Sequence, residues 1–308
     1  GQARIAPELE FALQGGVAAV ANRLDLSDDA LLANVREVQA RGGLTPDDGL
    51  RLIEEPIETA NGTRRARFAN FSVEMETGTG KTYVYIRTAL DLFRLYGLRK
   101  FIVVVPSVAI REGVLKTLRV TAKHLRGVYD NLPYRFCVYQ SESLAEVRQF
   151  ALSDSIELLV MTIDSFNKAT NVIRQATDRL QGETPIHLIQ ATRPVLILDE
   201  PQNMESELRV RALALLDPLF ALRYSATHRN PYNLVHRLTP FDAYRRGLVK
   251  RIEGASVVRE DDPNQVFLRL DRIDAAKHTI TARLAVHKLM ADGTVKEKIV
   301  TVRPGDSL

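Results

Sequence analysis

Six short apolar runs between residues 71 and 224 constrain the fold of this chain more than any other feature. Their apolar residues follow one another without polar alternation, which predicts strands that are buried on both faces. Longer segments with apolar residues at helical spacing separate the runs, and this alternation favours a parallel sheet flanked by helices. We therefore expect an α/β fold with strands at residues 71–75, 101–105, 136–139, 158–163, 195–198 and 219–224.

Helices are expected in the segments between these strands. Residues 82–96 carry an apolar stripe that stops before Gly97, as in a helix with a glycine after its C-terminus. A second helix is expected at about 110–126. A third is expected to open at Ser143, where Glu146 completes a capping box.

The two ends of the chain have different patterns. Residues 15–24 predict a short helix, and the polar stretch 25–67, with a helical segment around 28–40, is interpreted as an insertion. Near the C-terminal end, apolar and polar residues alternate at 265–270, 278–286 and 294–302. Such alternation is typical of antiparallel strands with one solvated face. We expect a first domain over 1–245 and a small β-rich segment over 246–308.

Composition excludes several classes of protein. The chain has 45% hydrophobic and 26% charged residues, as globular proteins do, and its apolar runs are far shorter than the roughly 18 residues of a membrane span. We find no export signal and expect a cytoplasmic location. The single cysteine, Cys137, and the spacing of the histidines argue against a zinc site. The net charge of +4 is too small to argue for nucleic acid by itself.

The strongest functional motif lies directly between an expected strand and an expected helix. Its residues are Glu76, Thr77, Gly78, Thr79, Gly80, Lys81 and Thr82. The glycines let backbone N–H groups surround phosphate oxygens, and the helix N-terminus adds partial positive charge. Lys81 would reach the β- and γ-phosphates, and Thr82 would offer its hydroxyl to Mg²⁺. Met75 stands where the strict pattern has glycine, so this is a variant phosphate-binding loop.

Two carboxylates follow the expected strand at 195–198. Side chains at the carboxyl end of a strand face the crevice where nucleotides bind in open α/β sheets. Asp199 would hold Mg²⁺, and Glu200 would orient the water that attacks the γ-phosphate. By itself, an acidic turn after a buried strand is the simpler interpretation. Ser225 and Thr227 follow another expected strand, where a Ser/Thr turn is the simplest interpretation.

The three motifs together resemble motifs I, II and III of superfamily 2 helicases in order and spacing. Four strings are similar, more narrowly, to the Res subunit of type III restriction enzymes. They are METGTGKTYVYIR (75–87), VVPSVAIREGV (104–114), Asp-Glu-Pro-Gln (199–202) and YSATHRNPYNLV (224–235). The resemblance covers about residues 14–257 and implies a first RecA-like domain of a P-loop NTPase.

The resemblance also implies ATP and Mg²⁺ as cofactors. The nucleotide would be bound by Gln14, Glu76, Thr77, Gly78, Thr79, Gly80, Lys81 and Thr82. The catalytic residues would be Lys81, Asp199, Glu200 and Gln202, and the metal ligands Thr82 and Asp199. Gln14 would read adenine, although a surface glutamine at a helix start is nearly as simple an interpretation.

Further residues would connect hydrolysis to DNA. Ser225 and Thr227 would couple the nucleotide site to DNA-bound conformations. Backbone contacts to nucleic acid are implied for Pro106, Ser107, Arg111, Ser165 and Asn167. Capping of the next helix is an equally simple role for these loops.

The implied function is ATP-driven movement on double-stranded DNA, in a Res subunit that works with a methyltransferase (Mod) subunit. This chain would be the first motor lobe, because it shows no second RecA-like lobe with arginine fingers and no nuclease domain. Two alternatives stay open. One is another superfamily 2 DNA or RNA helicase, and the other is a nucleotide- and DNA-binding platform that does not turn over ATP.

Overall fold

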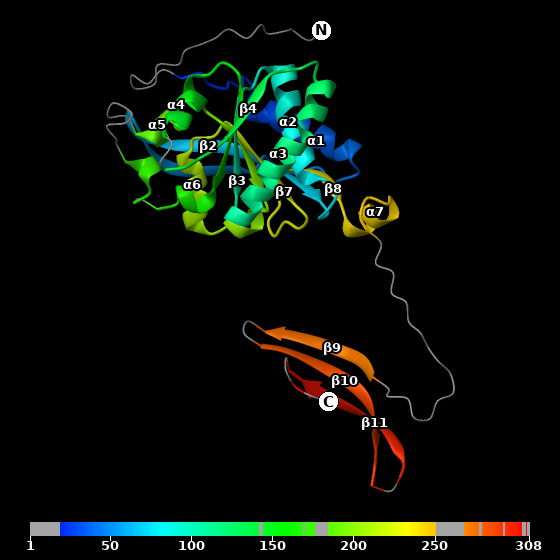
Figure 1. Ribbon diagram of the computed structural model, residues 1–308. Coiled ribbons are helices and arrows are strands. Elements are labelled where there is room, and N and C mark those ends of the chain that lie inside the picture. Colours follow the sequence, from blue (N-terminus) through cyan, green and yellow to red (C-terminus); the bar gives the residue numbers. More distant parts are fainter. Residues whose placement is uncertain are drawn as a thin grey trace. The chain divides into compact units, whose positions relative to one another are not determined.

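The chain divides into two compact units, Gly1–Arg251 and Ile252–Leu308. The computed structural model describes residues 19–141, 144–168, 170–175, 184–250, 268–276, 279–291, 293–303 and 306. Figure 1 shows helices around a central sheet in the first unit, and three strands without helices in the second.

The first unit is built on a sheet with the strand order β1-β2-β7-β6-β3-β5-β4, and β8 also pairs with β2. Every pair is parallel except β1 with β2. The strands are β1 (Leu52–Thr59), β2 (Gly62–Met75), β3 (Lys100–Val105), β4 (Tyr134–Val138), β5 (Ile156–Thr162), β6 (Val195–Asp199), β7 (Phe220–Ser225) and β8 (Leu234–Leu238). The predicted α/β fold is confirmed, and all six expected strands are present.

Helices cover both faces of this sheet. The buried side chains of α2 and α3 join one apolar layer, and those of α4, α5 and α6 join the other. Figure 1 shows α2 and α3 side by side. The helices are α1 (Asp28–Arg41), α2 (Lys81–Tyr96), α3 (Val108–Val128), α4 (Leu144–Leu152), α5 (Pro185–Ala191), α6 (Glu207–Leu215) and α7 (Pro240–Arg245), with 3₁₀ turns η1 (Ile163–Ser165), η2 (Val172–Arg174) and η4 (Pro201–Met204).

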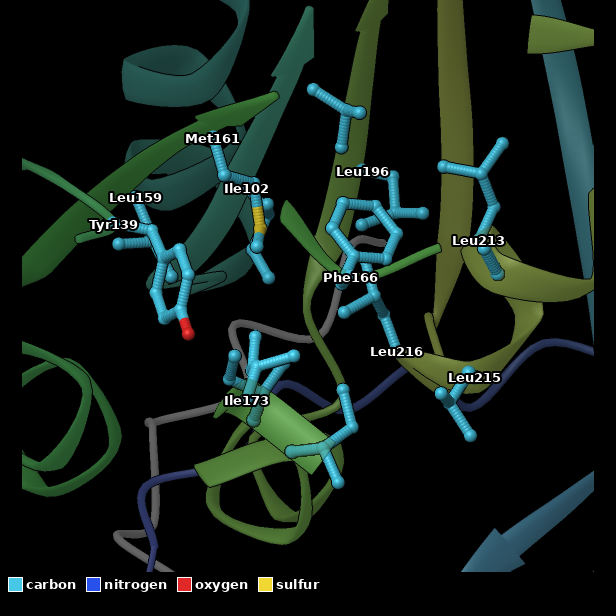
Figure 2. Packing of buried hydrophobic residues seen from close by; sticks show 14 of the residues in the cluster. Ile102, Tyr139, Leu159, Met161, Phe166, Ile173, Leu196, Leu213, Leu215 and Leu216 are labelled. Carbon is cyan, nitrogen blue, oxygen red and sulfur yellow. The ribbon is translucent and has the colours of Figure 1, made fainter. Parts of the chain in front are cut away.

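The apolar layer that contains the side chains of α4, α5 and α6 also anchors the loop that follows β5. Side chains of Ile102, Met161 and Leu196 project from three neighbouring strands towards Phe166 and Ile173 (Figure 2). Phe166 and Ile173 are fully buried although both lie outside the α-helices and strands of the α/β framework. Burying an aromatic ring in this way holds the polar residues on either side of it at the sheet edge.

Two strands of the sheet were not expected from the sequence. β1 is polar, with only Ile53 and Ile57 buried, and β8 is short and follows a turn. Both pair with β2, which begins at Gly62 instead of residue 71. Residues 25–67 therefore contain α1, β1 and the first part of β2.

The prediction of a short helix at residues 15–24 is wrong for residues 19–24, which are the part of it that the structure describes. Residues 19–24 are not helical, and the backbone N–H of Val20 donates to the carbonyl of Ala151 at 2.9 Å. The Asn22 side chain bonds main-chain groups of Arg99, Lys100 and Arg193, which holds this segment extended. Gln14 and Ser143 lie outside the described residues.

The second unit is an antiparallel sheet of β9 (Leu268–Ala276), β10 (Thr279–Leu289) and β11 (Val295–Val302), in the order β11-β10-β9. The predicted β-rich segment is confirmed. Leu270, Leu284 and Val300 are cross-strand neighbours, so they share one face. Leu270 is 54% exposed there. Among the described residues of the whole chain, no helix is long and apolar enough to cross a membrane.

Candidate nucleotide and nucleic-acid site

The three principal motifs meet at one edge of the parallel sheet. β7 lies between β2 and β6, and all three strands run in the same direction. The segments that follow them therefore emerge side by side at their carboxyl ends. The phosphate loop follows β2, the acidic pair ends β6, and Ser225 ends β7.

The phosphate loop connects Met75 to the first residue of α2, Lys81. Gly78 and Gly80 have φ angles of 83° and 91°, a region that only glycine enters without strain. The Thr79 hydroxyl donates to the carbonyl of Glu76 at 2.6 Å and closes the turn. No side chain caps the N-terminus of α2. The N–H groups of its first turn can therefore bind an anion.

Lys81 and Glu200 form an ion pair across the site, with side chains 10% and 22% exposed. Glu200 has φ 53° and ψ 56°, an uncommon conformation for this residue type. Its N–H donates to the carbonyl of Tyr224 at 2.9 Å, so the conformation is held by β7. Burial raises the pKa of Glu200, but hydrogen bonds from Lys81, Gln202 and Ser225 outweigh burial and lower it below its usual value.

Gln202 and Ser225 complete this network. The Gln202 amide donates to Glu200 Oε2 at 2.8 Å. The Ser225 hydroxyl lies 3.1 Å from the same oxygen, 2.8 Å from Gln202 Oε1 and 2.8 Å from the carbonyl of Thr227. A hydroxyl has one proton, so Ser225 can donate to only one of these three acceptors at a time. Its bond can therefore switch between the acidic motif and the Thr227 segment.

Asp199 lies deeper than Glu200. Burial, and then the charge of Glu200, raise its pKa to about 6, although Lys81 offsets part of this rise. The Tyr85 hydroxyl is 3.4 Å from Asp199 Oδ2. Tyr85 was missed from the sequence, but it is one helical turn after Lys81 and thus lies under the loop.

The oxygen atoms of Asp199 and Thr82 suit Mg²⁺. This ion prefers oxygen ligands and is often held by one or two carboxylates together with substrate phosphates. The described residues contain no group of three or more His, Cys, Asp or Glu side chains that could hold a metal alone. A cation also favours the ionised form of a carboxylate whose pKa burial has raised.

The residues expected to contact nucleic acid lie at the ends of β3 and β5. Ser107 Oγ accepts from the N–H of Ile110 at 3.4 Å, so it caps α3. Arg111 and Ser165, which are far apart in the sequence, line one cavity of about 460 Å³. Tyr139, Gln140, Ser141, Thr170, Asn171 and Val172 line the rest of it.

Asn167 and Pro106 are placed differently. The Asn167 amide donates to Asp164 Oδ1 at 2.8 Å, and its own buried Oδ1 has no hydrogen-bond partner in the described part of the chain. Pro106 follows β3 directly and precedes the cap of α3. Neither residue is among those that line the cavity.

Sequence comparison decides the family. The sequence model of the family described as "Type III restriction enzyme, res subunit" matches residues 46–230, which is more than half of the chain. The chain belongs to the Res subunit family of type III restriction enzymes. The family predicted from the motifs is confirmed, and the mostly parallel sheet agrees with the predicted α/β fold.

Relatives in the Res family are several times longer than this chain. The EcoP15I Res subunit of Escherichia coli is 28% identical over 74% of the chain, which spans 24% of that protein. The StyLTI Res subunit of Salmonella typhimurium is 32% identical over 52% of the chain, which spans 18% of it. Both names describe subunits of restriction-modification enzymes.

Solved structures show a weaker likeness. A nuclease-deletion mutant of the type ISP restriction-modification enzyme LlaGI, in complex with a DNA substrate mimic, has 12% identity and a TM-score of 0.40. The match covers 73% of this chain and 21% of that one. The SWI2/SNF2 ATPase core of Sulfolobus solfataricus, in complex with dsDNA, has 17% identity and a TM-score of 0.34, over 51% and 27% of the two chains.

Proposed function

We propose that this chain is the ATP-hydrolysing first motor lobe of a type III restriction enzyme Res subunit and that it acts on double-stranded DNA. The observation that carries the proposal is the connected network of Lys81, Glu200, Gln202 and Ser225. It joins the ends of three strands, and each member has a role in phosphoryl transfer.

The arrangement of charges supports the hydrolytic role. Lys81 can exchange its partner Glu200 for the γ-phosphate of ATP, which has the same sign of charge. Glu200 would then keep its bond to Gln202 and polarise the attacking water. Asp199 and Thr82 would hold Mg²⁺, which neutralises phosphate charge when it is bound. The N–H groups of residues 76–82 would bind the phosphates, and Gln14 would contact adenine.

DNA would bind along the ends of β3 and β5. Ser107, Arg111, Ser165 and Asn167 offer hydroxyl, guanidinium and amide donors for phosphate oxygens, and Pro106 shapes the turn before them. The shared cavity of Arg111 and Ser165 supports this placement. Ser225 and Thr227 would couple the two sites, since the Ser225 hydroxyl can donate either to the Glu200 carboxylate or to the carbonyl of Thr227.

The complete protein would contain further parts. In this proposal, residues 1–245 form the first lobe, residues 246–308 lead to a second lobe with arginine fingers and to a nuclease domain, and a methyltransferase subunit is the partner. Missing arginine fingers typically cost about a thousandfold or more in the rate of phosphoryl transfer. The chain by itself should therefore bind ATP and hydrolyse it slowly.

Two substitutions test the proposal. Lys81→Ala should weaken binding of a fluorescent ATP analogue at least tenfold, because the phosphate loses its main cation. Glu200→Gln should still bind the analogue but should release phosphate at least a hundredfold more slowly, with or without double-stranded DNA. A wild-type chain that binds ATP and DNA without any turnover would instead indicate a binding platform.

A further inference from the structure

We infer that the ion pair between half-buried Glu205 and buried Arg223 is a positioning element for ATP hydrolysis, which holds the η4 turn and thereby the Gln202 side chain beside Glu200. This inference rests on the proposed function. Neither residue belongs to a motif that is recognisable in the sequence.

β7 holds the η4 turn at two points. Arg223 and Ser225 are two residues apart on this strand, so their side chains project from the same face of the sheet. Ser225 Oγ lies 2.8 Å from Gln202 Oε1, inside the turn. Arg223 Nη2 donates to Glu205 Oε1 at 2.7 Å, one residue beyond the end of the turn. The turn that carries Gln202 is thus fixed on both sides.

The same ion pair reaches the segment that follows Thr227. The guanidinium of Arg223 lies 4.8 Å from the centre of the Tyr232 ring, within the range of a cation–π contact. Tyr232 is itself tied to β2, because its N–H donates to Ser72 Oγ at 2.9 Å and its carbonyl accepts from the N–H of Ser72 at 2.9 Å. The Asn230 amide lies 3.4 Å from Glu205 Oε2. The pair therefore connects the acidic motif with the segment after the third motif.

Stability alone does not explain this pair. Arg223 is 3% exposed, and its Nε is buried without a hydrogen-bond partner in the described part of the chain. Burial lowers the pKa of its guanidinium, although Glu205 offsets part of this effect. Apolar residues of similar volume often stabilise such a position as well as a buried ion pair does, because charges lose solvation when they are buried. A directional contact, in contrast, sets the position of its partner.

Small displacements of this turn would reach the reacting atoms. Gln202 donates to the carboxylate of Glu200, whose other oxygen pairs with Lys81. In enzymes a shift of about 1 Å in a catalytic group can cost on the order of a hundredfold in rate. A loosened η4 turn would therefore slow hydrolysis without removing the residues that bind phosphate.

The test compares two variants of the Arg223–Glu205 ion pair with a variant of a second ion pair at the other edge of the sheet. Arg223→Met keeps the side-chain volume but removes the positive charge, and Glu205→Gln keeps the side-chain shape but removes the negative charge of the pair. Arg135→Met is the control, because Arg135 pairs with buried Glu157 at 2.9 Å near the amino ends of β4 and β5. For each full chain, kcat and KM of ATP hydrolysis with double-stranded DNA are measured, together with the affinity for a fluorescent ATP analogue and the thermal midpoint.

Arg223→Met and Glu205→Gln should each lower kcat at least tenfold and leave KM and analogue affinity within about twofold, since the phosphate loop is unchanged. The double variant should be no slower than the worse single variant, because both remove one interaction. Arg135→Met should keep kcat within about twofold. The inference would be overturned if both variants kept the kcat of the wild type. It would also be overturned if the variants lost affinity for the ATP analogue in proportion to a loss of folded protein. A wild-type chain without turnover would instead overturn the proposed function.

Discussion

The two edges of the parallel sheet use buried polar side chains differently. At the amino edge, Glu157 pairs with the Arg135 side chain, but Asn22 and Lys100 bond to the main chain. Asn22 donates to the carbonyls of Lys100 and Arg193 and accepts from the N–H groups of Arg99 and Lys100. Lys100 in turn donates to the carbonyl of Phe150 at 2.5 Å. Each of these contacts by Asn22 and Lys100 pairs a main-chain group near the amino ends of the strands.

At the carboxyl edge, polar side chains bond mainly to one another. Lys81 pairs with Glu200, Glu200 accepts from Gln202, and Ser225 has three competing acceptors. Side chains can exchange partners by rotation, whereas a backbone carbonyl in a strand cannot move alone. The amino edge is thus built for stability and the carboxyl edge for rearrangement.

Asn22→Leu should give the largest effect on stability. It removes the partner of four main-chain groups, and each buried group left without a partner costs roughly 1–3 kcal/mol. We expect the free energy of unfolding, measured by circular dichroism in urea, to fall by about 3–5 kcal/mol. Affinity for an ATP analogue should not change in the folded chain. Asn61→Ala, in the exposed β1–β2 turn, is the control and should change little. A fall below about 1 kcal/mol would remove the distinction between the two edges.

Asp199→Asn, unlike Asn22→Leu, should raise the free energy of unfolding at neutral pH, and it should abolish ATP hydrolysis. The folded chain binds the Asp199 proton more tightly than the unfolded chain, because burial raises the pKa from 3.8 to about 6. The wild type therefore loses stability as pH rises through this range, by roughly 1.36 kcal/mol for each pH unit between the two pKa values. Thermal unfolding at pH 7.5 should show the variant to be more stable by about 2–3 kcal/mol, and this gain should vanish below about pH 4.

The same Asp199 variant should lose Mg²⁺-dependent turnover at least a hundredfold, since an amide is a poor ligand for this ion. Phosphate release at increasing Mg²⁺ concentrations measures this loss. Asp48→Asn, on an exposed loop, is the control for the change of charge and should alter neither property. An Asp199→Asn chain that is less stable than the wild type at pH 7.5 would show that Asp199 is a structural carboxylate.

The smallest expected effect is the difference in the rate of phosphate release between alanine variants of two serines, one at each edge of the sheet. Ser225→Ala should slow phosphate release about tenfold and change the unfolding free energy by less than about 1 kcal/mol, because Gln202 still bonds Glu200. Ser153 Oγ accepts from the N–H of Ser155 at 3.2 Å near the amino edge. Ser153→Ala should leave phosphate release unchanged. Equal rates for both variants would contradict a coupling role for Ser225.

Much of this protein could be predicted from its sequence. Continuous apolar runs specified the central strands, because a strand buried on both faces tolerates few polar residues. The glycines of the phosphate loop and the acids after β6 were recognisable since their chemistry needs neighbours in sequence. Parallel strands then place such motifs at one edge, so the sequence also indicated that the phosphate loop and the acidic motif would belong to one site.

Tertiary structure alone decided features that depend on distant partners. Residues 19–24 have a helical pattern, yet Asn22 bonds β3 and the segment before β6, and these contacts outweigh local preference. β1 and β8 lack a continuous apolar run and so were not recognised, and both are strands because β2 offers them free backbone groups. Arg223 and Glu205 are 18 residues apart and belong to no motif. Their pairing exists because β7 and the η4 turn pack together, and no local pattern in the sequence encodes that contact.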